Sequence, residues 1–177
     1  PVVEPTATEV PPTEAPAGLT CAEPVKVGLI TDVSGSLAIY GAHILRSFML
    51  GMEYATGAAG SAGEKFDLTQ TQENTFKIDD CEIQVFVRDD GSNAENTATV
   101  ARELIDVQKV NILVGTVSSG ATATLQGIAL ESKIPLIVAP AAANDITGVN
   151  FNEYTFRTSR NNYQDAINEC SALVQKY

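Results

Sequence analysis

Residues that several large protein classes require are scarce in this chain of 177 residues. No apolar run approaches the roughly 20 residues that a membrane-spanning helix needs. Lys and Arg number 11 against 22 Asp and Glu, which gives a net charge of −11 at pH 7. No basic stripe remains that would follow a phosphate backbone, so we expect no nucleic-acid partner.

Residues for catalysis are equally scarce. The single histidine, His43, falls beside the apolar face of an expected helix, and we interpret it as structural. The GxGxxG and GxxxxGK[ST] phosphate-binding loops are both missing, and no nucleophile, base and acid set surrounds the one histidine. Asp89 and Asp90 are adjacent at the end of an expected strand, where we favour a solvated turn or a helix-capping role over acid-base work. We therefore expect neither an enzyme nor a cofactor.

The chain has three cysteines, Cys21, Cys81 and Cys170. Their spacing matches neither a zinc site nor a CxxC redox motif, so we expect no metal. Cys21 and Cys81 each precede a strand-like run, from Val25 and Ile83. If these strands are parallel neighbours, both cysteines lie at one sheet end within bridging distance, and the protein belongs outside the cytoplasm. Two unrelated thiols are the alternative.

The first twenty residues contain five of the eight prolines and three glutamates but no Lys or Arg. We expect residues 1–20 to be a disordered, extended tether and residues 21–177 to form the globular domain. Such Pro/Thr/Glu stalks resemble those that follow the lipidated cysteine of bacterial surface lipoproteins, which here would lie upstream of Pro1. An acidic interdomain linker would have the same composition.

From Val25 onward, β-rich runs alternate with amphipathic helices. This order specifies βαβ units, hence an α/β fold with a doubly wound parallel sheet and helices on both faces. Residues 56–80 are expected to form a surface excursion with a hairpin around residues 66–78. The last helix, from Asn161 or Asn162, is expected to bury Ala166, Ile167, Cys170 and Val174.

Three turns follow expected strands, at residues 32–40, 115–122 and 139–145. The central one places Ser118 and Ser119 at a helix N-terminus, where free N–H groups attract oxygen ligands. Plain helix capping is the alternative role for both serines. Ligands of parallel sheets bind beyond the carboxyl ends of the strands, and three such turns together favour ligand binding.

Four segments carry a resemblance to a known family: "VKVGLITDVSGSLAIYG", "DDGSNAENTATVARELI", "ILVGTVSSGATATLQGIALESKIPLIVAPAAA" and "YTFRTSRNNYQD". In this order they resemble the amino-terminal lobe of the type I periplasmic-binding fold. The leucine/isoleucine/valine-binding proteins of ABC importers are the most similar group. The resemblance covers about residues 25–177 and leaves out the family's second lobe.

The resemblance also implies roles for individual residues. It implies that Ser119 binds the ligand carboxylate, with Ser118 beside it, and that Tyr40 lies in the pocket wall. Backbone groups of Ala141 and Ala142 would contact the ligand head. Ala143 stands where the family commonly has a threonine that holds the amino-acid head group, so the sequence departs from the amino-acid signature there.

The function that follows is extracytoplasmic solute binding. The resemblance implies a protein, tethered by a lipid anchor, that delivers a small polar ligand to the membrane permease of an ABC importer. Such a protein performs no chemistry and needs no cofactor. A ligand-sensing ectodomain of a receptor or regulator with the same fold is the alternative.

Overall fold

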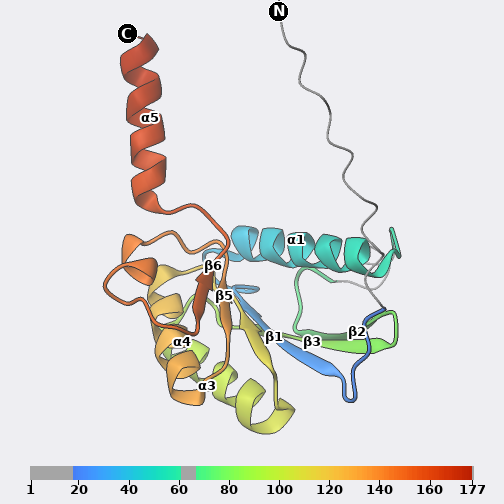
Figure 1. Ribbon diagram of the computed structural model, residues 1–177. Coiled ribbons are helices and arrows are strands. Elements are labelled where there is room, and N and C mark those ends of the chain that lie inside the picture. Colours follow the sequence, from blue (N-terminus) through green and yellow to red (C-terminus); the bar gives the residue numbers. More distant parts are fainter. Residues whose placement is uncertain (1–17, 61–66, 177) are drawn as a thin grey trace, which may run out of the picture.

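The structure, a computed structural model, describes residues 18–60 and 67–176. They form a six-stranded sheet with helices on both faces, as Figure 1 shows. The strands are β1 (Val25–Thr31), β2 (Gln72–Ile78), β3 (Cys81–Asp89), β4 (Ile112–Val114), β5 (Leu136–Val138) and β6 (Thr155–Arg157). The helices are α1 (Ala38–Thr56), α3 (Ala94–Glu103), α4 (Ser119–Ser132) and α5 (Asn162–Lys176), with short helical turns η1 (Leu104–Gln108) and η2 (Asn144–Thr147).

The order of the strands in the sheet is β2-β3-β1-β4-β5-β6. All neighbours pair in parallel except β2, which runs antiparallel to β3 at the edge. The expected α/β fold with a largely parallel sheet is confirmed. The hairpin expected around residues 66–78 is wrong, because Gln72–Ile78 is one strand and turns at Asp79 and Asp80 to pair with β3.

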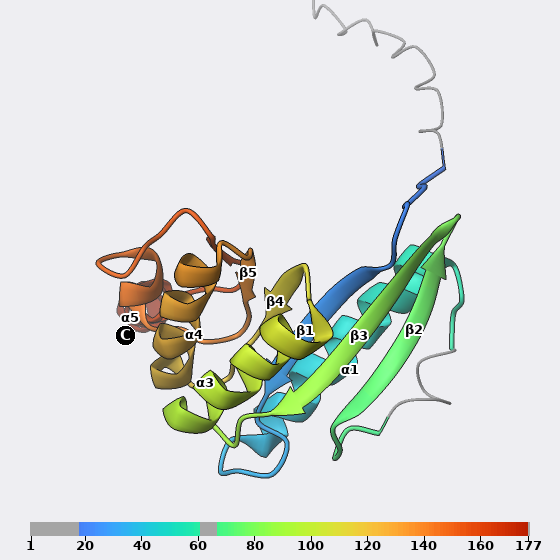
Figure 2. The same cartoon turned by 90° about the horizontal axis from the view of Figure 1, so that it is seen from below.

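The sheet separates two layers of core. Figure 2 shows α1 on one face and α3 and α4 on the other. Successive residues of β1 point to opposite faces: Val27 and Leu29 pack with residues of α1, whereas Ile30 packs with those of α3 and α4. Because successive strand side chains alternate between faces, both sides of the strand are buried.

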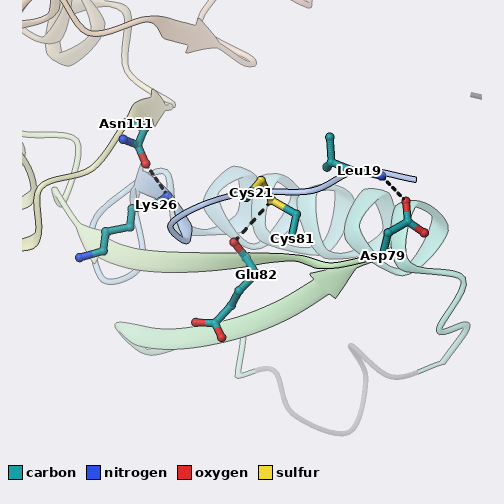
Figure 3. Close-up of a disulfide and its surroundings, with 7 residues drawn as sticks. All are labelled: Leu19, Cys21, Lys26, Asp79, Cys81, Glu82 and Asn111. Atoms are coloured by element: carbon teal, nitrogen blue, oxygen red, sulfur yellow. Dashed lines mark hydrogen bonds between the residues drawn. A yellow bond between two sulfur atoms is a disulfide. The ribbon is translucent and has the colours of Figure 1, made fainter. Parts of the chain in front are cut away.

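The disulfide between Cys21 and Cys81 joins the starts of β1 and β3 (Figure 3). The two strands are parallel neighbours with Val25 opposite Ile83, so the preceding cysteines meet, with 4.8 Å between their Cα atoms. This confirms the expected pairing. The backbone N–H of Leu19 also donates to Asp79 at 2.8 Å, so the end of the expected tether lies against the β2-β3 turn. Residues 1–17 of that tether lie outside the described residues.

Helix α5 projects from the body of the molecule (Figure 1). It begins at Asn162, as expected, but the expected burial of Ala166, Ile167, Cys170 and Val174 is wrong. The side chains of Ile167 and Val174 are 47% and 81% exposed. Periodicity identified an apolar face correctly, but it does not say whether another element covers that face. In the described part of the chain, no helix has both the length and the apolar character to cross a membrane.

Candidate ligand-binding site

Four loops leave the carboxyl ends of β1, β4, β5 and β6 and surround one pocket of about 480 Å³. The pocket therefore lies at the edge where parallel sheets bind their ligands. Its polar wall consists of Tyr40, Ser118, Ser119, Ser159 and Arg160. The apolar wall consists of Leu37, Val117, Pro140 and Ala142.

The turn between β4 and α4 supplies both expected serines. Gly115 has a φ of 140°, and any Cβ there would stand 2.1 Å from the carbonyl oxygen of Ile30, so only glycine fits. Ser118 is the N-cap of α4, with its hydroxyl accepting from the N–H of Ala121 at 3.5 Å. The carbonyl of Ser118 in turn accepts from the Thr122 hydroxyl at 2.9 Å. The turn is thus held in one conformation.

Ser119 has a different role from Ser118. Its hydroxyl accepts from the backbone N–H of Ala143 at 3.2 Å and so links the start of α4 to the loop after β5. Capping explains Ser118, but Ser119 lies in the pocket wall and contacts a second loop. A hydroxyl in this position retains its own proton for donation to a ligand oxygen.

The loop after β5 places the three expected alanines differently. Ala142 lines the pocket, and its carbonyl accepts from the N–H of Asn162 at 2.8 Å. Ala141 is only 2% exposed and packs in the core on the α4 side of the sheet. Ala143 is half-buried; its N–H is bound to Ser119 and its carbonyl accepts from the guanidinium of Arg157. Of the three, only Ala142 lies in the pocket wall.

Tyr40 stands in the first turn of α1 and is 53% exposed, with its ring edge-on to His43 at 6.4 Å between centroids. The position of α1 depends on Asp32, whose carboxylate accepts from the N–H groups of Gly35 and Leu37 at 2.5 and 2.9 Å. A Cβ at Gly41 would lie 1.6 Å from the Asp32 carbonyl oxygen, so the helix packs directly on this backbone.

Asp89 and Asp90 tie the neighbouring loops together. Asp89 accepts from the Val33 N–H at 2.8 Å and from the Ser34 hydroxyl at 2.5 Å. Burial raises the pKa of Asp89, but these hydrogen bonds outweigh burial and hold its pKa below the ordinary value. Asp90 is fully buried, and burial raises its pKa. The expected capping role is wrong, because the N-cap of α3 is Asn93, and the expected solvated turn is wrong for Asp90, which is fully buried.

Ser159 and Arg160 are pocket residues that sequence reasoning missed. They connect β6 to α5, and their place in the wall depends on β6 pairing beside β5. The available signal is the β-rich run "YTFRT" at residues 154–158, which adds a fourth strand that ends at the same edge. The Arg160 guanidinium donates to the Pro140 carbonyl at 3.2 Å and pairs with Asp165 at 3.3 Å.

A second pocket, of about 440 Å³, adjoins the first and shares Tyr40 and Pro140 with it. Its wall is mainly apolar and includes Ile44, Phe48 and Ile137, between α1 and the strands β4 and β5. In the described residues, no group of three or more His, Cys, Asp or Glu side chains is arranged to hold a metal ion.

Comparisons with known proteins agree with this geometry. The Leu/Ile/Val-binding protein homolog 8 of Brucella abortus is 28% identical over 135 residues, which is 76% of this chain and 29% of that protein. An ABC-type branched-chain amino acid transporter structure from Rhodopseudomonas palustris is 34% identical, with a TM-score of 0.65 over 81% of this chain and 34% of that one.

Two further solved structures carry ligands. LivJ of Streptococcus pneumoniae, in complex with isoleucine, is 27% identical with a TM-score of 0.62 over 78% of this chain and 34% of that one. A solute-binding protein of R. palustris in complex with 4-hydroxybenzoate is 23% identical, with a TM-score of 0.65 over 87% and 36%, and shows likeness of fold alone. The chain spans about a third of the length of these relatives. The family model for periplasmic binding proteins matches residues 24–177, and the chain belongs to that family.

Proposed function

We propose that this chain is the amino-terminal lobe of an extracytoplasmic solute-binding protein that delivers a small polar ligand to the permease of an ABC importer. The ligand is an amino acid or a related carboxylate or amide, and the protein catalyses no reaction. The observation that carries the proposal is the pocket at the carboxyl edge of the sheet, where Tyr40, Ser118 and Ser119 lie together. The Cys21–Cys81 disulfide supports a location outside the cytoplasm.

The N-terminus of α4 supports a ligand with a negatively charged head. Helix N-termini attract anions through free N–H groups and the helix dipole. Ser118 and Ser119 add two hydroxyls at this point. The isoleucine named for LivJ of Streptococcus pneumoniae carries a carboxylate of this kind. We therefore place the ligand carboxylate at Ser119. The rest of the ligand then contacts the remaining walls of the pocket.

The pocket has walls from one side only, which fits the proposal that a second lobe closes over the ligand. The chain spans about a third of its relatives, so the opposite wall would come from sequence outside these 177 residues. Ala143, which replaces the threonine typical of amino-acid binders, gives no hydroxyl for an ammonium group. A partner for any ligand ammonium would then come from the second lobe.

A thermal-shift screen of the full-length protein tests this proposal. Its panel comprises L-isoleucine and other amino acids, 4-hydroxybenzoate and other aromatic acids, amides, and short carboxylates. A ligand at 100 times its dissociation constant should add about 2.7 kcal/mol to the free energy of unfolding. No stabilisation by any member would contradict the proposal. If a ligand binds, but cells that lack the protein still take up that ligand at the normal rate, the ligand-sensing ectodomain would be favoured.

A further inference from the structure

We propose that Arg160 is a specificity-determining residue that makes the pocket select carboxylates over uncharged amides. This inference rests on the proposed function and names the ligand class of the same pocket. Arg160 is the one cationic residue among the described residues that line the pocket, and no carboxylate lines it. A ligand head that enters the pocket therefore meets a positive group and hydroxyls in its wall, and the one carboxylate paired with that positive group, Asp165, does not line the pocket.

The position of Arg160 suits a shared anion contact. Its guanidinium is fixed from two sides, by the Pro140 carbonyl and by Asp165 in the first turn of α5. The hydrogen bond to Pro140 uses one of the five N–H donors of the guanidinium, and the ion pair with Asp165 lies at Nε. The planar group can offer two of its remaining donors side by side to a carboxylate.

Ser159 provides a second, independent indication of a ligand. Its hydroxyl oxygen is buried and has no hydrogen-bond partner among the described residues, although the residue lines the pocket. A buried hydroxyl without a partner is unfavourable, and a ligand oxygen in the pocket would satisfy it. Ser159 and Arg160 therefore add to the polar lining of the pocket that Ser118 and Ser119 also form.

The ion pair with Asp165 does not prevent this role. The side chains of Arg160 and Asp165 are 53% and 37% exposed, and ion pairs at such exposed positions are weak. The buried carboxylate of Asp32, in the loop after β1, does not line the pocket and is already engaged by Gly35, Leu37 and Ser92. A ligand can therefore bind the Arg160 guanidinium by displacing only the weak ion pair with Asp165.

The test compares matched carboxylates and amides on the full-length protein by calorimetry: benzoate with benzamide, and 4-methylpentanoate with 4-methylpentanamide. Each pair has the same shape and differs in charge. We expect the parent protein to bind at least one carboxylate about tenfold or more tighter than its amide. Arg160→Gln should weaken that carboxylate about tenfold, leave the amide unchanged, and reduce the effect of added salt on affinity.

Asp165→Asn is the control that separates ligand binding from support of α5. It removes the partner of Arg160 but keeps the guanidinium, so carboxylate affinity should stay the same or rise. Equal losses in Arg160→Gln and Asp165→Asn, for carboxylate and amide alike, would overturn the inference and make Arg160 an anchor for α5. Thermal unfolding without ligand checks that both variants are folded.

The outcomes also separate this inference from the proposed function. If Ser119→Ala weakens a carboxylate and Arg160→Gln does not, the solute-binding function stands and the role of Arg160 is wrong. If none of the four probes binds the parent protein, or amides bind as tightly as carboxylates, charge selection is overturned. Binding of other ligands in the thermal-shift screen would still support solute binding.

Discussion

At the level of single residues, Ser119 distinguishes ligand binding from helix capping. Its hydroxyl lies in the pocket wall and contacts Ala143, whereas Ser118 caps α4. Ser119→Ala should weaken a carboxylate ligand about ten- to a hundredfold, because one charge-assisted hydrogen bond of about 1.5–3 kcal/mol is lost. Calorimetry on the full-length protein measures this change.

Two other serines serve as references for that variant. Ser171 is exposed on α5, so Ser171→Ala should change neither affinity nor stability. Ser118→Ala should lower the free energy of unfolding by about 1 kcal/mol through loss of the helix cap. Unchanged affinity in Ser119→Ala would limit the Ser119 hydroxyl to joining α4 with the loop after β5.

Asp89 gives a prediction about pH. Hydrogen bonds from Ser34, Val33 and Gly91 outweigh burial and lower its pKa, so the ionised form stabilises the fold. That stabilisation is full above the ordinary aspartate pKa, near 4, and is lost as pH falls through the lowered pKa. Asp89→Asn should therefore cost about 1–2 kcal/mol at pH 7. Urea unfolding at pH 7 and at pH 2 should show a difference that vanishes at the lower pH.

The pKa of Asp90 is shifted in the opposite direction to that of Asp89, so the pH dependence of its contribution to stability is also opposite. Burial raises its pKa, so its contribution to stability is present below the unfolded pKa and is lost as pH rises through the folded one. Asp90→Asn should then be neutral or stabilising at pH 7, in the same urea measurement. A loss at pH 7 as large as that of Asp89→Asn would show that the hydrogen bonds of Asp90 to Ser92 and Thr97 outweigh burial.

At the level of elements, the disulfide fixes the start of β1 to the start of β3. The bond closes a loop of 60 residues, which on the loop-entropy model contributes about 4 kcal/mol. A Cys21→Ala/Cys81→Ala double variant should lose about this much free energy of unfolding, while Cys170→Ala should lose little because Cys170 is exposed. Non-reducing peptide mapping checks the pairing directly, and two free thiols in oxidised protein would contradict it.

The elements that could be predicted are those with strong local patterns. Val25–Thr31 and Cys81–Asp89 are β-rich runs buried on both faces, and α4 follows a clear cap at Ser118. β2 was harder, because "QENTFKI" is largely polar and only half-buried, with burial at alternate positions. Its partner depends on the turn at Asp79, which has a φ of 51°. The turn is local, but its residues Asp79 and Asp80 lack the glycine that usually marks a two-residue hairpin turn.

The residues of the site also divide into those that a local sequence pattern predicts and those that depend on how the strands pair. Ser118 and Ser119 could be found because a strand, a tight turn and a helix start are adjacent in the sequence. Ser159 and Arg160 were missed, because they reach the pocket through the pairing of β5 with β6, which the run at residues 154–158 does not specify by itself. The resemblance implies a ligand contact through the backbone of Ala141, and that contact stays a prediction, since the structure shows only that the methyl group packs in the core. Direction of a side chain in an irregular loop is decided by packing, which composition does not reveal.

At the level of the whole molecule, the proline-rich N-terminal segment yields a prediction from composition. Residues 1–17 hold too little apolar surface to offset the entropy of ordering. Their deletion should change neither the midpoint of thermal unfolding nor ligand affinity. Deletion through Thr20 also removes the Leu19 contact with Asp79 and the Thr20 bridge to Asp80, and serves as the comparison. Weaker binding after the shorter deletion would show that the segment packs on the domain.

The exposed face of α5 tests whether a second lobe completes the protein. Tyr163, Ile167, Cys170 and Val174 recur at the spacing of one helix face, yet no residue of α5 is buried. In the chain of 177 residues, Ile167→Asp should change the free energy of unfolding by less than about 0.5 kcal/mol, as at other exposed sites.

The full-length protein should respond differently to the same substitution. If further sequence packs on this face, Ile167→Asp removes a buried apolar side chain and should cost about 1.5–3 kcal/mol. Glu169→Gln, also exposed on α5, is the matched control and should be silent in both proteins. Urea unfolding of the two lengths measures the difference. A small effect in both would mean that the apolar face of α5 stays uncovered and that the ligand is not enclosed by packing on this helix.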